Sequence, residues 1–270
     1  MRGTSRASLA AVEARFEPVL AAAGAGASDL GEQLFAVVDA LDASGSLRRT
    51  LGDPSIAGDA KAELVGGLLH AADPRAVAVV QDLVRQRWSA DADLAESVER
   101  LGFHAVLARA ENEGQLALVE DELFRLTRAM VGQREARQTL FDPAIPGSAR
   151  AELVDLILAG RTTQVTALVA RRAAAAPRGR RYVATLGHVS DLIAERRQRE
   201  VATVTTATEL SAAQQERLAQ ILQQAYGREI QLNVVLDPNV LGGLRIQVGP
   251  QVVDSTVLSR LADARRRLAG

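Results

Sequence analysis

The chain of 270 residues contains no cysteine and few aromatic residues, only 3% of the total. The lack of cysteine excludes disulfide bonds, thiol redox chemistry and every metal site built on thiolates. The low aromatic content removes the base-stacking side chains on which binders of single-stranded nucleic acid depend. The formal net charge of -1 provides no overall positive field for a nucleic acid. These absences argue against a redox protein and against a nucleic-acid binder.

Long apolar runs are also absent, and none approaches the roughly 18 residues that a membrane-spanning helix needs. Near the N-terminus, Glu13 and Arg15 interrupt the stretch that would have to serve as the apolar region of a secretory signal. We therefore expect a protein that is neither exported nor membrane-spanning. A hydrophobic content of 47% and a charged content of 24% are typical of a soluble globular chain.

An internal repeat is the most informative feature that the sequence does contain. Residues 47–69 align with residues 136–158 at an offset of 89, with 13 identities in 23 positions. Apolar residues recur at helical spacing in both copies. We therefore predict two tandem helical bundles, the first at residues 1–93 and the second, with a connecting helix, at residues 94–199.

Local signals predict where the helices of these bundles begin and end. The pairs Asp53-Pro54 and Asp142-Pro143 mark equivalent helix boundaries, because a residue before proline disfavours the helical region. Pro18 should kink the first helix, since it removes one backbone donor. That helix is predicted from apolar residues on one face: Leu9, Val12, Phe16, Val19 and Leu20.

From about residue 200 the apolar period changes from 3.6 to 2. The segments 201–207, 230–236 and 244–248 therefore read as strands. Ser211 and Gln214 form a capping box for a helix that stops at Gly227, and a last helix is expected from Asp254 or Ser255 onward. The predicted fold class is mainly α: two tandem helical-bundle repeats followed by a small C-terminal α/β domain at residues 200–270.

We find no residues arranged for catalysis or for binding a cofactor or metal. The glycine-rich segment 24–31 fails the dinucleotide fingerprint in spacing and follows a helix, so we interpret it as a linker between helices. His70, His104 and His188 are scattered and have no carboxylate at metal-ligand spacing. We expect a protein that is not an enzyme, with no catalytic residue, no cofactor and no metal.

A basic stretch at residues 160–200 carries a local charge of +6. Two interpretations are open: a solvated helical face, or a docking surface for an acidic partner or for anionic lipid headgroups. Its nine arginines are Arg161, Arg171, Arg172, Arg178, Arg180, Arg181, Arg196, Arg197 and Arg199.

The C-terminal run at residues 230–268 resembles the terminal signature of the δ subunit of F-type ATP synthases, bacterial relatives of the mitochondrial oligomycin-sensitivity-conferring protein. The family has a single N-terminal helical domain, whereas this chain carries that domain twice, and Thr4 stands where relatives usually have a tyrosine. The residues of the signature are Asp237, Pro238, Gly242, Gly243, Gly249, Asp254 and Ser255.

The resemblance implies a non-catalytic stator subunit that couples proton-driven rotation to ATP synthesis. Such a subunit is present in one copy per complex, peripherally, at the cytoplasmic face of the bacterial cell membrane. It links the α subunits of the catalytic head to the b-subunit peripheral stalk and binds no nucleic acid. The alternative from the arginine-rich segment is a helical nucleic-acid-binding or adaptor protein.

The resemblance also implies where the N-terminal helix of an α subunit binds, namely on the first and fifth helices of the first copy. The competing interpretation is that these side chains form the core of the bundle. For the second copy we hypothesise a brace that holds the stalk or a second α subunit. The candidate binding residues are Ser5, Ala7, Ser8, Val12, Val77, Val80 and Val84.

Overall fold

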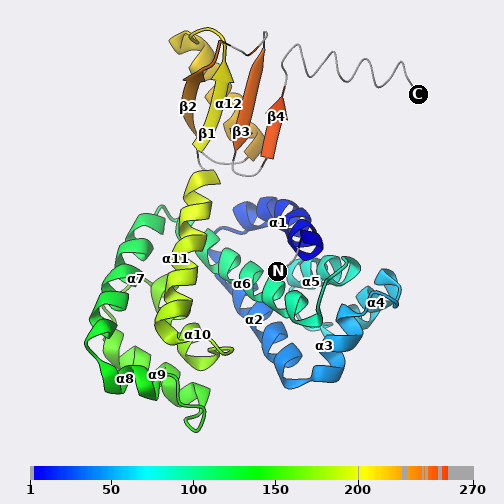
Figure 1. Ribbon diagram of the computed structural model, residues 1–270, viewed down its shortest axis with the longest axis vertical. Helices are drawn as coiled ribbons and strands as arrows, with labels where there is room; N and C mark the ends of the chain where they lie inside the picture. Colours follow the sequence, from blue (N-terminus) through cyan, green and yellow to red (C-terminus); the bar gives the residue numbers. More distant parts are fainter. Residues whose placement is uncertain are drawn as a thin grey trace. The chain divides into compact units, whose positions relative to one another are not determined.

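The computed structural model describes residues 3–199, 201–226, 230–238, 240, 243–248 and 251–254. The chain divides into two compact units, residues 1–192 and 193–270. The first unit is helical in its described part (Figure 1). Its elements are α1 (Gly3–Ala23), the 3-10 helix η1 (Gly24–Gly26), α2 (Ala27–Ala43), α3 (Gly45–Gly52), α4 (Gly58–Leu68), α5 (Pro74–Arg85), α6 (Asp91–Asn112), α7 (Leu116–Val131), α8 (Arg134–Thr139), α9 (Gly147–Leu158), α10 (Gln164–Ala175) and α11 (Tyr182–Arg199), which continues into the second unit.

The first helix forms as its apolar spacing predicts. Leu9, Val12, Phe16 and Leu20 are buried on one face of α1, and Val19 packs partly buried against the same core. The helix runs without interruption through Pro18. The glycine-rich segment after it forms η1 and the first turn of α2, as expected of a linker between helices.

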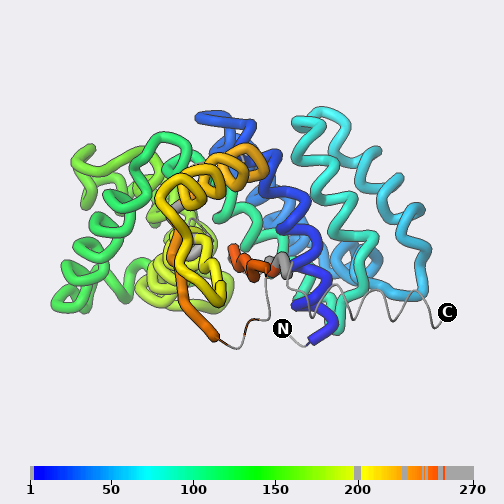
Figure 2. Tube along the Cα trace, turned by 90° about the horizontal axis from the view of Figure 1, so that it is seen from above, coloured from blue at the N-terminus to red at the C-terminus, as the bar shows by residue number. Residues whose placement is uncertain are grey.

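The repeat of the sequence is also a repeat of the fold. An offset of 89 residues carries the helices from α2 to α5 onto those from α7 to α10, with ends that differ by at most two residues. The same offset carries α1 onto α6, and α6 onto α11. Figures 1 and 2 show the two bundles side by side, the first from blue to cyan and the second from green to yellow-green.

Helix α6 therefore belongs to both bundles, as the last helix of the first and the first helix of the second. Its residues Leu94, Val98 and Leu101 join Leu9 and Phe16 of α1 in one hydrophobic core. On its other side α6 contacts α7 and α10 of the second bundle. The sequence boundary at residues 93 and 94 thus falls at the start of a helix that the two bundles share.

Each bundle also uses the same polar contact to hold the turn that contains its aspartate-proline pair. Lys61 Nζ donates a hydrogen bond to the carbonyl oxygen of Asp53 at 3.1 Å, and Arg150 Nη1 donates to that of Asp142 at 3.1 Å. Both cationic side chains are buried. Because the two pairs are separated by the same offset of 89, the turn and its anchor were duplicated together.

The second unit contains a sheet and one described helix: β1 (Val201–Thr206), α12 (Ala212–Tyr226), β2 (Gln231–Leu236), β3 (Leu244–Val248) and β4 (Gln251–Asp254), with strand order β2-β1-β3-β4. Strands β1 and β2 are parallel and are joined through α12, as a parallel pair requires. The other two pairings, β1 with β3 and β3 with β4, are antiparallel. Ala202, Leu222, Ile230 and Val248 form the core of the unit.

The fold class predicted from the sequence, mainly α with a small C-terminal α/β part, is confirmed. The capping box is confirmed as well, because Gln214 N donates to Ser211 Oγ at 3.3 Å and Ser211 N donates to Gln214 Oε1 at 2.9 Å. Residues 255–270, where a last helix was expected, lie outside the described residues, as do Gly227, Gly242 and Gly249.

The described residues of the C-terminal signature form part of the turn that follows β2. Asp237 N donates to the carbonyl oxygen of Thr206 at 2.9 Å, and Val240 N donates to that of Asp237 at 3.1 Å. Gly243 has a φ of 84°, a region of backbone space that glycine adopts without strain. The hydrogen bonds of Asp237 and the positive φ of Gly243 suit the turn between β2 and β3.

Candidate partner-binding surfaces

Helices α1 and α5 lie antiparallel and are joined by polar contacts near the surface. Ser8 Oγ donates to the carbonyl oxygen of Arg87 at 2.8 Å. Arg15 donates from Nε and Nη2 to both carboxylate oxygens of Asp82, at 2.7 and 2.9 Å. On the same side of α1, Ala7 is exposed and Ala11 is half-buried. We call Ala7, Ser8, Ala11, Arg15 and Asp82 the α1–α5 face.

The structure distributes the candidate binding residues over different surroundings. Ala7 and Ser8 lie on the α1–α5 face. Val77 is half-buried one helical turn before Gln81, whose Nε2 donates to the carbonyl oxygen of Ala62, so it lies on the side of α5 that faces α4. The other candidate valines, Val12, Val80 and Val84, are at most 2% exposed and belong to the hydrophobic core.

Ser5, the remaining candidate, fastens α1 to the start of α6. Its hydroxyl donates to Asp93 Oδ2 at 2.6 Å and accepts from Ser89 N at 2.8 Å, and the residue is fully buried. Arg15 and Asp82, which lie at the surface beside the candidate residues Ala7 and Ser8, were not predicted from the sequence. The signal for Arg15 was its spacing, because Ala7, Ala11 and Arg15 follow one another at four-residue intervals along one side of α1.

A half-buried acid, Glu13, binds α1 to α6 from the opposite side. Glu13 Oε1 accepts from Arg100 Nε at 2.7 Å and lies 3.4 Å from His104 Nε2. Burial raises the pKa of Glu13, but the hydrogen bond from His104 and the charges of His104 and Arg100 outweigh burial and lower it to about 2. The shared helix is therefore held to the first bundle by an ion pair as well as by its apolar face.

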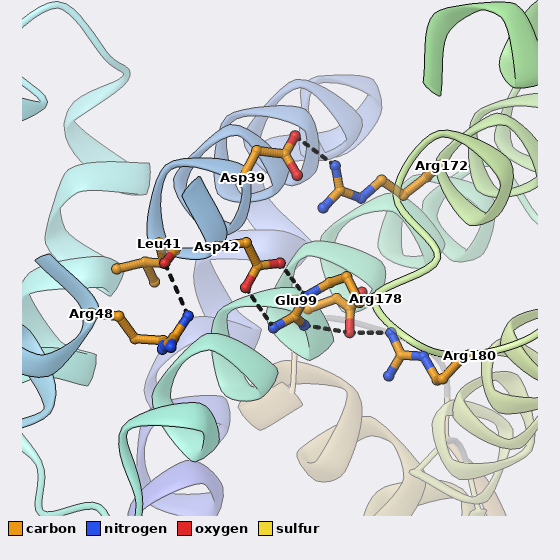
Figure 3. Close-up of polar contacts among 8 residues, drawn as sticks. All are labelled: Asp39, Leu41, Asp42, Arg48, Glu99, Arg172, Arg178 and Arg180. Atoms are coloured by element: carbon orange, nitrogen blue, oxygen red, sulfur yellow. Dashed lines mark hydrogen bonds and ion pairs between the residues drawn. The ribbon is translucent and has the colours of Figure 1, made fainter. Parts of the chain in front are cut away.

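In the second bundle the counterparts of α1 and α5 are α6 and α10. There α2 of the first bundle packs against α6 and is joined to α10 through Arg172 (Figure 3). Phe35 of α2 lies edge-on to Phe103 with ring centroids 4.9 Å apart. Arg172 of α10 stacks 4.7 Å from the centroid of Phe35 and donates from Nη1 to Asp39 at 2.8 Å. The α6–α10 surface of the second bundle is thus occupied by a helix of the chain itself.

The loop between α10 and α11 adds a second set of ion pairs between the bundles (Figure 3). Arg178, at a φ of 50°, donates to both carboxylate oxygens of Asp42 at 2.6 and 3.2 Å, and to Glu99 Oε2 at 2.9 Å. Arg180 donates to the same oxygen of Glu99. Burial lowers the pKa of Arg178, but the hydrogen bond to Asp42 and the charge of Glu99 outweigh it, so the pKa is raised.

These contacts change the interpretation of the basic stretch. Arg172 and Arg178 pair with carboxylates of α2, Arg180 pairs with Glu99 of the shared helix α6, and Arg171 lies 3.4 Å from Asp155 within the second bundle. For the three arginines at the junction, the acidic partner is another part of the same chain. No pattern in the sequence indicates this pairing, because the partners are separated by 79 to 136 positions.

Within the described residues no three His, Asp or Glu side chains gather as a metal site would require. His70 Nδ1 contacts the carbonyl oxygen of Gly67 at 3.1 Å, and His188 is half-buried, with a pKa lowered mainly by burial. None of the described helices combines the length and the apolar character needed to cross a bilayer.

Comparison with known proteins identifies the family. Residues 104–268 match the family model described as the ATP synthase delta (OSCP) subunit. The chain is also 53% identical to ATP synthase subunit delta of Beutenbergia cavernae, over 100% of both chains. The chain belongs to the ATP synthase delta (OSCP) subunit family. It is accordingly a stator subunit of an ATP synthase, which is a membrane-associated complex.

Other relatives in this family match along the same length. ATP synthase subunit delta of Kineococcus radiotolerans is 44% identical over 99% of this chain and 98% of its own. That of Thermobifida fusca is 41% identical over 100% of both chains. Because these matches span the whole chain, the relatives contain residues equivalent to both bundles. The OSCP family model begins at residue 104, within α6, and so covers the second bundle and the C-terminal unit.

Proposed function

We propose that this delta-family chain is a non-catalytic connector between two other subunits. The α1–α5 face holds the N-terminal helix of an α subunit at the catalytic head, and the C-terminal unit holds the end of the b-subunit stalk. The chain acts in one copy per complex at the cytoplasmic face of the cell membrane. Its task is to keep the head from turning with the rotor, so that rotation driven by protons deforms the catalytic sites.

One observation supports the choice of the α1–α5 face over its counterpart in the second bundle. The equivalents of Ser8 and Arg15 on α6 are Ser97 and His104, which are buried, whereas Ala7 and Arg15 on the α1–α5 face are exposed. The contact with α2 also illustrates how two neighbouring helices of this fold hold a third, through an aromatic ring and an arginine-aspartate pair. Recognition of a helix laid against two others is a common mode of peptide binding.

The chemistry of the α1–α5 face fits a helical ligand. Ala7 and Ala11 are small, so a second helix can approach α1 closely. The ion pair between Arg15 and Asp82 lies beside them, with the two side chains 54% and 27% exposed. A pair this accessible contributes little to the stability of the fold and provides a positive and a negative group that orient a ligand.

The proposal predicts that Ala11→Arg weakens binding of a synthetic N-terminal peptide of the α subunit by roughly tenfold or more, because the larger side chain blocks close approach. Ala10→Arg is the matched control, since Ala10 is an exposed neighbour that points away from α5. Isothermal titration of the full chain measures both affinities, and circular dichroism verifies that each variant remains helical. Equal affinities for the two variants would remove the α1–α5 face from the proposal.

A nucleic-acid-binding role receives no support from these contacts. Arg172, Arg178 and Arg180, three arginines of the segment on which that alternative rests, pair with carboxylates of α2 and α6. The family membership likewise favours the stator role.

A further inference from the structure

Helix α7 exposes a surface that its counterpart α2 buries. At equivalent positions, Phe35 of α2 is 4% exposed and Phe124 of α7 is 58% exposed. One turn further on from Phe35 lies Asp39, and one turn further on from Phe124 lies Arg128. At the next equivalent position Asp42 is replaced by Val131, which is 65% exposed. We call Phe124, Arg128 and Val131 the α7 face.

The difference in exposure has a structural cause. Phe35 is enclosed because α6 contributes Phe103 and the backbone of Gly102, and α10 of the following bundle contributes Arg172. Phe124 is 58% exposed, and α11 leads into β1 rather than into a third bundle that could provide a counterpart of Arg172. On its own helix, Arg128 lies 5.9 Å from the centroid of its aromatic ring.

The charge of the α7 face is opposite to that of the covered surface on α2. On α2, Asp39 and Asp42 meet arginines of the second bundle. On α7 the equivalent of Asp39 is Arg128, for which the described part of the chain provides no carboxylate partner. Arg134 and Arg137 of α8 follow it and are also exposed. Residues 128–137 expose these three arginines and one acid, Glu135, so the surface favours an acidic ligand.

We propose that the α7 face binds an acidic amphipathic helix of another subunit of the complex, with a small residue opposite Phe124 and a carboxylate opposite Arg128. The identity of the complex rests on the proposed function, whereas the surface itself does not. A second copy of the chain does not fit this surface. The part of the fold that covers α2 presents Arg172, which has the same charge as Arg128, and it is already occupied.

A photoreactive residue in place of Phe124 tests the proposal in the purified, assembled ATP synthase. p-Benzoylphenylalanine at position 124 should cross-link to a helix of another subunit that is rich in Asp and Glu, identified by mass spectrometry of the linked peptide. The same residue at position 11 reports separately on the α1–α5 face. A link from position 11 without one from position 124 would overturn the α7 proposal, as would a link to lipid, to a second copy or to a segment without acidic residues.

A link from position 124 without one from position 11 would instead contradict the α1–α5 face and leave the α7 proposal standing. Charge reversal then tests the predicted ion pair. Arg128→Glu should weaken binding of the linked helix, as a synthetic peptide, by about tenfold, and replacing the opposing acid by lysine should restore it. Arg161→Glu, an exposed arginine of the same bundle, is the control. Equal binding by the two variants would show that Arg128 makes no ion pair with the helix.

Discussion

At the residue scale, the apolar spacing of α1 predicted which side chains are buried but not which of the neighbouring side chains bind partners. Val12 and Val80 are spaced like their neighbours, and only packing shows that they are in the core while Ala7 is at the surface. Polar residues that join α1 to α6 were harder still to predict. Ser5 and Glu13 lie within the first helix, yet their partners are about 88 positions away in α6.

Glu13 gives a prediction about acid stability. Its pKa is lowered from the model-compound value of 4.5 to about 2, so its ion pair stabilises the fold fully above pH 4.5 and loses this effect as the pH falls through 2. Glu13→Gln should lower the free energy of unfolding by about 2–3 kcal/mol at pH 7. The deficit should shrink as the pH falls from 4.5 toward 2.

Urea unfolding at a series of pH values measures this difference. Glu63→Gln, which changes an exposed glutamate of α4, serves as the control and should match the unmodified chain throughout. A deficit for Glu13→Gln that stays constant between pH 7 and pH 3 would show that the charge of Glu13 does not stabilise the fold.

At the element scale, the helices of both copies were predictable because the repeat aligns them and because apolar periodicity marks each one. The sharing of α6 was not predictable, because the sequence alone shows two copies in series and says nothing of which helices pack together. Close contact of α6 with α2 depends on two glycines. A Cβ on Gly31 would lie 2.6 Å from Val106, and one on Gly102 would lie 2.6 Å from Phe35.

Gly102→Ala is therefore expected to destabilise the chain by about 1–3 kcal/mol, because α2 must move away from α6. Gly187→Ala in α11 is the matched control. A Cβ at Gly187 meets no atom within 4 Å, so the higher helix propensity of alanine should leave stability unchanged or raise it by up to about 1 kcal/mol. Thermal unfolding compares the two variants, and equal melting temperatures would contradict the close packing of α2 and α6.

At the scale of the whole molecule, the shared helix joins two bundles into one compact unit of residues 1–192. We expect these bundles to unfold together, because α6 supplies apolar side chains to the core of the first bundle and contacts α7 and α10 of the second. Leu34→Ala tests this expectation, because it truncates a fully buried side chain and leaves a cavity in the first bundle.

Hydrogen exchange in mild denaturant, read by mass spectrometry, should show Leu34→Ala lowering the protection of α2 and of α10 by the same amount. Loss of protection in α2 with α10 unchanged would mean that the bundles unfold independently. Coupled unfolding would suit a connector under torque, since a load applied to one bundle is then borne by both.

We propose that the chain holds an α subunit and the b stalk at the same time, by separate parts. Two moderate contacts made by one chain act together with far greater strength than either alone. The direct measurement is native mass spectrometry of the full chain mixed with an α N-terminal peptide and the soluble part of b. We predict a ternary complex with one copy of the chain, and Ala11→Arg should lose the peptide while it retains b. Complexes that contain either partner but never both would contradict the account.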